Sequence, residues 1–125
     1  MDNAKIAKIF FRFGMIDTIE GKSSCKEHIL AGREVPLEVQ RIFNSDKIAE
    51  LSGKWGVPEL GSPIQYHWAL VELDNGKSYE IEVYNLAIMI LHSEDERIKR
   101  LFRFLVKAER CIKAMKKQNL NINLR

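Results

Sequence analysis

The sequence predicts an α+β fold, and three observations lead to this class. A long amphipathic segment over residues 93–118 predicts a C-terminal helix. An Asn75-Gly76 turn between two alternating segments predicts a β-hairpin. Short segments that open with helix-capping residues fill the N-terminal half. A chain of 125 residues can bury a core of its own, so we expect residues 1–125 to form a single domain.

Composition is that of an ordinary globular protein. Hydrophobic residues make up 46% of the chain and charged residues 30%, which is typical of a folded domain rather than a disordered segment. No apolar run approaches the ~18 residues of a membrane span, and the N-terminus has no secretory signal pattern. The two cysteines, Cys25 and Cys111, are too few for a disulfide scaffold. We therefore expect a cytoplasmic protein with free thiols.

Charge is distributed unevenly along the chain. Residues 1–96 contain 10 Lys or Arg against 16 Asp or Glu, whereas residues 97–125 contain 10 against 1. The formal net charge of +3 hides this contrast. Such asymmetry indicates either an anionic partner for the C-terminal part or neutralisation of one part of the chain by the other.

The C-terminal helix is the most clearly predicted element. Ser93 and Glu96 form a capping box at its start. Apolar residues recur at three- and four-residue steps along one side, namely Ile98, Leu101, Phe102, Leu105, Ala108, Ile112 and Met115. Basic residues recur along the opposite side, namely Lys99, Arg103, Lys107, Arg110, Lys113 and Lys117. We predict that the apolar side packs on the core and that the basic side binds a negatively charged partner.

The first segment, residues 4–13, is predicted to be a helix. Ile6, Ile9 and Phe13 share one side of it. A strand over residues 9–16 is the competing interpretation, because β-branched and aromatic residues are frequent there.

Three further short helices are predicted before the hairpin. Ser24 and the glutamate three positions later form a capping box for a helix that ends at about residue 32. Cys25 would then lie in its first turn. Helices over residues 36–43 and 45–53 follow, the first opened by a proline.

The hairpin joins residues 64–73 to residues 77–84. A two-residue turn fixes its register, so that Trp68 faces Val83 and Leu70 faces Ile81. We expect these four side chains to form the face that packs on a helix.

Two other segments complete the expected architecture. Residues 119–125 alternate apolar and polar side chains and are the candidate for a third strand, the alternative being a frayed tail. Residues 86–91 are apolar throughout, and we expect a buried helix there, with Asn85 as its cap.

A cysteine nucleophile is the sharpest chemical hypothesis. Cys25 lies at a predicted helix N-terminus, where the helix dipole favours a thiolate. His67 lies near the start of a strand and can serve as its base. Glu80 or Glu82 lies on the paired strand, on the same predicted face as His67, and can orient the imidazole.

The run from Tyr66 to Val71, in which His67 and Trp68 precede an apolar strand and a hairpin, resembles the histidine-bearing strand of papain-like cysteine hydrolases of the NlpC/P60 and LRAT kind. In that family the cysteine opens a helix and a polar residue on the next strand orients the histidine. The resemblance implies acyl transfer or amide hydrolysis by Cys25 with His67, and Glu80 is the nearest match to the third member.

No metal or cofactor is expected. Cys25 and His28 lie three residues apart, but no second pair of ligands completes a metal site. The glycine-rich loops that bind nucleotides are also missing from the sequence.

The function that we predict is that of a small non-enzymatic binding or regulatory protein. Its basic helix side would bind an acidic protein surface or, as the second possibility, a nucleic acid. The cysteine hydrolase is the alternative. A homo-oligomer is a third interpretation, because Phe104 and Ile112 widen the apolar side of the helix enough to pair helices between chains.

Overall fold

The computed structural model describes residues 4–17, 20–57 and 63–123, and in these residues six strands form one mixed sheet. The order is β2-β1-β5-β6-β4, and β3 also pairs with β1, on the same side as β2. β4 runs parallel to β6, whereas the other pairs are antiparallel. The strands are β1 (Ile6–Asp17), β2 (Lys22–Ser23), β3 (Lys26–Ala31), β4 (Gly53–Trp55), β5 (Pro63–Leu73) and β6 (Ser78–Tyr84).

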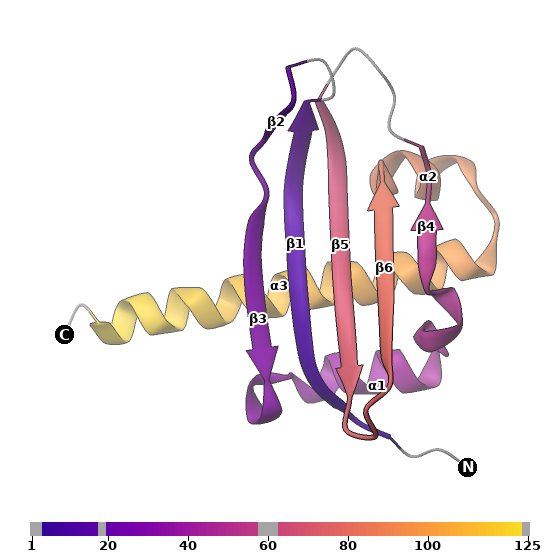
Figure 1. Cartoon of the computed structure of the whole chain (residues 1–125). Coiled ribbons are helices and arrows are strands. Elements are labelled where there is room, and N and C mark those ends of the chain that lie inside the picture. The colour runs from indigo at the N-terminus through magenta and orange to yellow at the C-terminus, as the bar shows by residue number, and fades with distance from the viewer. Residues whose placement is uncertain (1–3, 18–19, 58–62, 124–125) are drawn as a thin grey trace.

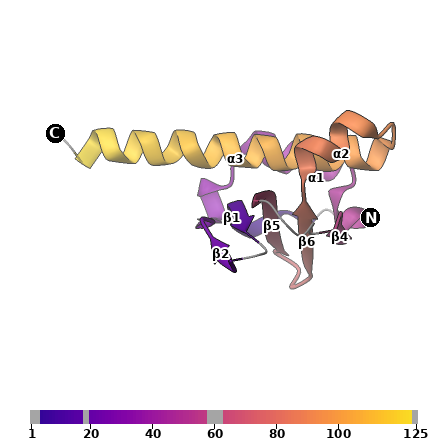
Figure 2. The same cartoon turned by 90° about the horizontal axis from the view of Figure 1, so that it is seen from above.

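The helices of the described residues lie on one face of this sheet (Figure 1, Figure 2). The longest of them, α3, crosses the strands, and α1 lies beside it (Figure 1). The α+β class and the long C-terminal helix are therefore confirmed. The helices are α1 (Leu37–Ser45), α2 (Leu86–His92) and α3 (Glu96–Asn123), and two 3-10 turns are η1 (Gly32–Glu34) and η2 (Ile48–Leu51).

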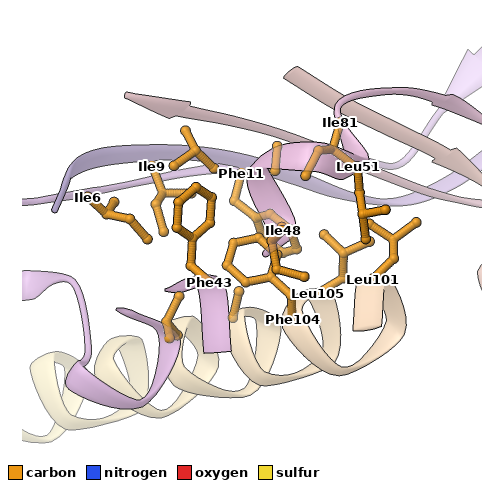
Figure 3. Close-up of a cluster of buried hydrophobic side chains, with 14 of the residues drawn as sticks. Ile6, Ile9, Phe11, Phe43, Ile48, Leu51, Ile81, Leu101, Phe104 and Leu105 are labelled. Carbon is orange, nitrogen blue, oxygen red and sulfur yellow. The ribbon is translucent and has the colours of Figure 1, made fainter. Parts of the chain in front are cut away.

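The core lies between the sheet and these helices (Figure 3). Phe11 of β1, Ile81 of β6 and Phe104 of α3 are fully buried there. Phe43 of α1 packs on Phe104, with ring centroids 5.9 Å apart. Burying one such side chain stabilises the fold by roughly 1.5–3 kcal/mol, so α3 owes its position mainly to its apolar side.

The predicted N-terminal helix is wrong, because residues 6–17 form β1. This strand is paired on both edges, with β3 and with β5. A register shift between Ile6 and Lys8 places both Ile6 and Ile9 on the buried face. Their three-residue spacing, which resembles that of a helix, is thus an irregularity in a strand.

The predicted helix over residues 24–32 is also wrong. Its place is taken by β3, in which His28 and Leu30 face the core and alternate with exposed residues. The hydroxyl of Ser24 does not cap a helix but donates to the carbonyl of Met15, at 3.4 Å. Pairing with β1 therefore overrides the local capping pattern. The next predicted helix is confirmed as α1, and the one after it shrinks to the single turn η2.

The hairpin is confirmed, but its predicted register is wrong by one residue. Leu70 faces Glu80, and Ala69 faces Ile81. The turn is longer than expected, because the backbone N–H of Leu73 donates to the carbonyl of Lys77 at 2.8 Å. A shift by one residue exchanges the two faces of a strand. Trp68 and Leu70 consequently lie on the face away from the helices, whereas His67, Ala69 and Val71 lie toward the core.

The end of the chain is helical where a third strand was expected. α3 continues to Asn123, so a strand is wrong for residues 119–123, and residues 124–125 lie outside the described part. The apolar segment before α3 is confirmed as the helix α2, but its predicted burial and cap are wrong. Leu86 is the one buried residue of this helix, Ile88 and Leu91 are exposed, and the side chain of Asn85 makes no capping hydrogen bond.

Candidate functional site

The basic side of α3, defined as Lys99, Arg103, Lys107, Arg110 and Lys113, is the first candidate surface. The structure places the first members of this set beside acidic groups of the same chain. The guanidinium Nε of Arg103 lies 2.8 Å from Oδ2 of Asp46, and Nζ of Lys107 lies 2.8 Å from Oε2 of Glu38. The hydrogen bond from Lys107 lowers the pKa of Glu38 below its usual value. Part of the basic side is therefore neutralised by the chain itself.

The carboxylates of the hairpin do not contribute to this neutralisation. Glu80 and Glu82 lie on the sheet face opposite to α3, because the register of β5 and β6 places them there. The groups that neutralise α3 instead come from α1 and from the residue that ends it, Asp46. Carboxylates of the same chain therefore neutralise Arg103 and Lys107.

The last described members of the basic side, Arg110 and Lys113, make no ion pair with another element among the described residues. Arg110 is exposed and has no ion pair among the described residues. Lys113 is exposed, lies 3.4 Å from Glu109 one helical turn earlier, and has its ammonium 5.4 Å from the ring centroid of Phe13. The side chain of Lys117 lies outside the described part. Charge on this end of the helix remains accessible to a partner.

This end of α3 also leaves the sheet. Figures 1 and 2 show the helix continuing past β3 into space not occupied by other elements. Met115 still packs on the core, and residues 116–123 follow it in the helix. At 1.5 Å per residue this overhang, residues 116–123, is about 12 Å long.

A groove lies beneath α3 where the helix passes over β3. It has a volume of about 310 Å³. Leu30, Ile112 and Met115 give it an apolar lining, and Glu27 and Glu34 also line it. The carboxylate of Glu27 is paired with Arg12, at 3.4 Å.

The predicted catalytic residues are placed on three different parts of the fold. Cys25 lies between β2 and β3 rather than at a helix N-terminus, with its Sγ 3.9 Å from the carbonyl of Met15. His67 lies on β5 and faces α3. Glu80 lies on the other sheet face and accepts a hydrogen bond from Nε1 of Trp68, at 3.1 Å. Activation of Cys25 by a helix dipole and orientation of His67 by Glu80 are therefore wrong.

The partner of His67 is Glu109, which the sequence reasoning missed. Nε2 of His67 lies 3.7 Å from Oε2 of Glu109, and the imidazole is only 3% exposed. Burial lowers the pKa of His67, and the carboxylate of Glu109 opposes this shift. Glu109 is the only acidic residue after Glu96, and that isolation was the signal in the sequence.

A small pocket adjoins this pair. Phe13, Gln65, Glu109 and Lys113 line it together with His67, and its volume is about 250 Å³. The imidazole Nδ1 is buried and has no hydrogen-bond partner among the described residues. Lys113, which lines this pocket, places its ammonium near both Phe13 and Glu109, so the pocket already contains a cation of the chain itself.

The sheet face away from the helices carries a network in which charges and aromatic rings contact one another. The guanidinium of Arg12 lies 5.1 Å from the ring of Trp68. Glu82 accepts hydrogen bonds from the hydroxyls of Tyr66, at 2.7 Å, and Tyr84, at 3.0 Å. Burial and this bond raise the pKa of Tyr66. These groups satisfy one another, so this face is a weaker candidate than α3.

Two further features are absent from the described residues. No group of three or more His, Cys, Asp or Glu side chains is positioned to hold a metal ion there. No helix in that part of the chain combines the length and the apolar character needed to cross a membrane.

The fold and its surfaces define the class: a small α+β protein with one sheet, helices on one face and a long basic helix. Comparison with protein-family models, curated proteins and solved structures finds no match to this chain.

Proposed function

We propose that this chain is a small binding protein that recognises a negatively charged partner through the basic end of α3. This end comprises Arg110, Lys113 and the overhang, whose sequence continues with Lys116 and Lys117. From Arg110 to the C-terminus the sequence contains no acidic residue. The basic end is therefore the longest stretch of uncompensated positive charge in the chain.

The observation that supports this proposal is that the basic residues of α3 differ in whether they are paired with carboxylates of the same chain. Arg103 and Lys107 already contact Asp46 and Glu38 at 2.8 Å, and a partner must compete with these carboxylates. Arg110 has no such competitor among the described residues. Exposed charges of this kind accelerate association and set specificity more than they add affinity, and their effect weakens as salt rises.

An acidic protein surface fits this end better than a nucleic acid. Single-stranded nucleic acids gain much of their affinity from bases stacked on aromatic side chains. Phe104 of α3 is buried in the core, and the ring of Phe13 is covered by the ammonium of Lys113. Carboxylates of a protein, in contrast, can be bound by the cations alone, without aromatic side chains.

The test compares two double variants with the same change in net charge. R110E/K113E removes the exposed cations of the basic end, whereas R33E/R41E reverses two exposed arginines on η1 and α1. Binding of a fluorescent poly-L-glutamate is measured at low ionic strength, with a single-stranded oligonucleotide as the second probe. We expect R110E/K113E to weaken poly-L-glutamate binding by about tenfold or more and R33E/R41E to leave it within about threefold.

Two results would count against the proposal. An equal loss in both variants would reduce the effect to net charge alone. Tight binding of the oligonucleotide with weak binding of poly-L-glutamate would move the partner from an acidic protein to a nucleic acid.

A further inference from the structure

The carboxylate of Glu109 lies between two basic side chains. Its Oε2 is 3.7 Å from Nε2 of His67, and its Oε1 is 3.4 Å from Nζ of Lys113. The side chain of His67 is 3% exposed, whereas that of Lys113 is 65% exposed. One carboxylate therefore serves a buried base and an accessible cation at the same time.

The charged groups that act on His67 are both on α3. Its neighbours on β1 and β6 are apolar, namely Phe11, Phe13 and Val83. His28 of β3 lies on Phe13, with ring centroids 5.2 Å apart, rather than on the imidazole of His67. Among the described residues, Glu109 is thus the group that can compensate a proton on His67, and Lys113 is the cation that competes for it.

The neutral imidazole leaves the pair of Glu109 and Lys113 without net charge. The carboxylate opposite Nε2 favours the ring hydrogen on that nitrogen, so that an added proton binds Nδ1. Nδ1 is buried and has no hydrogen-bond partner among the described residues. The imidazolium form of His67 therefore depends on Glu109 for the compensation of its charge.

Burial decides which of the two cations keeps the carboxylate. A buried cation without a counter-ion costs far more free energy than an exposed one. Lys113 can extend its ammonium into water, but His67 is enclosed between β5 and α3. Burial lowers the pKa of His67 below its ordinary value of 6.5, and Glu109 opposes this shift. Proton binding at mildly acidic pH therefore engages Glu109 with His67 and releases Lys113.

We infer that His67 and Lys113 compete for Glu109, and that a proton on His67 frees the ammonium of Lys113 for the acidic partner. This inference rests on the proposed function, because Lys113 belongs to the basic end of α3. By linkage, a partner that binds Lys113 leaves Glu109 to His67 and so favours the proton. The competition is complete within one chain. The helix pairing between chains that the sequence suggests is wrong, because Phe104 and Ile112 are buried within one chain.

The competition is tested in the free chain. The imidazole signals of His67 are followed by NMR from about pH 8 to about pH 5. K113M removes the competing cation, and we expect it to raise the pKa of His67, whereas E109Q removes the compensating charge and should lower that pKa. K99M makes the same change at another exposed lysine of α3 that is paired with a glutamate, and it should leave the pKa unchanged. Equal values in K113M and K99M, or an unchanged value in E109Q, would overturn the inference.

The release of Lys113 is tested by binding. Dextran sulfate is the probe, because its sulfate groups remain ionised at pH 5, whereas glutamate side chains approach their own pKa there. We expect its affinity to rise by about threefold from about pH 7.5 to about pH 5. H67Q should lose this gain, and so should K113M, which keeps His67. H92Q removes an exposed histidine from α2 and should retain the gain.

The inference and the proposed function fail in different ways. A gain of the same size in H67Q and H92Q would overturn the release of Lys113, while binding through the basic end of α3 would stand. Absence of binding to poly-L-glutamate and to dextran sulfate at every pH would overturn the proposed function and its coupling to the proton. The competition for Glu109 would still be decided by the pKa of His67 in the free chain.

Discussion

The two parts of α3 differ in what holds them. Up to Ala108 the helix lies across the sheet, its apolar side is buried, and Arg103 and Lys107 are paired with carboxylates of α1 and of the residue after it. From Glu109 to Met115 the apolar side is still docked through Ile112 and Met115, whereas Arg110 and Lys113 are exposed; after Met115 the helix continues past β3 (Figure 1). One continuous basic pattern in the sequence therefore serves two purposes, docking in the first part and accessible charge in the second.

The largest expected contrast is in stability. F104A removes a fully buried ring of the first part and should lower the free energy of unfolding by about 3–5 kcal/mol. M115A truncates a half-buried side chain at the end of the sheet and should cost about 1 kcal/mol, because less apolar area returns to water. Urea denaturation measures both. Equal costs would show that the second part is docked as firmly as the first.

Charge reversal should produce a smaller difference in stability between the same two parts of α3. R103E/K107E places carboxylates beside Asp46 and Glu38 and should destabilise the fold by about 1 kcal/mol, since exposed pairs are worth little individually. Among the described residues Glu109 is the one carboxylate paired with these two cations, so R110E/K113E should change stability by less than about 0.5 kcal/mol. Thermal unfolding at low salt provides the comparison. A larger loss for R110E/K113E would show that its cations hold the fold.

Releasing the paired cations should strengthen polyanion binding slightly. E38Q/D46N removes the carboxylates that engage Lys107 and Arg103 while keeping side-chain size. The freed cations should raise the affinity for poly-L-glutamate by about twofold to threefold at low salt. Fluorescence titration beside the parent chain measures the change. No gain would indicate that these carboxylates do not compete with a partner.

The smallest effect should come from His67, at the boundary between the two parts. Burial lowers its folded pKa below the ordinary value of 6.5, while Glu109 opposes and Lys113 reinforces the shift. The unfolded chain therefore binds the proton first as pH falls below about 6.5, and stability decreases through that window. H67Q should reduce this decrease, with His28 across Phe13 unchanged. Melting curves between pH 7.5 and pH 5.5 follow the effect. An identical slope in H67Q would assign the decrease to other groups.

Much of the fold follows from the sequence, and the errors have physical causes. The long helix and the hairpin depend on local patterns, namely the periodicity over residues 93–118 and the turn at Asn75-Gly76, and both are present. β1 and β3 depend on pairing between distant segments, which local capping and periodicity do not report. The irregularity between Ile6 and Lys8 even produces a helical spacing within a strand.

The candidate site was predictable only in part. The basic side of α3 is visible in the sequence, but which of its members are neutralised depends on where α1 packs. The hairpin register determines which face of the sheet carries Glu80. Because the turn is longer by one residue than predicted, Glu80 lies on the face opposite His67. Glu109 could be noticed as an isolated acid, but only the fold places it beside His67.

We propose that the basic end of α3, and not its first part, binds the negatively charged partner. Titration of the isotopically labelled chain with poly-L-glutamate, followed by amide chemical shifts at low ionic strength, tests it most directly. We expect perturbations to concentrate from Arg110 onward and to be small at Lys99, Arg103 and Lys107. Perturbations centred on those three residues, or on the sheet, would contradict it.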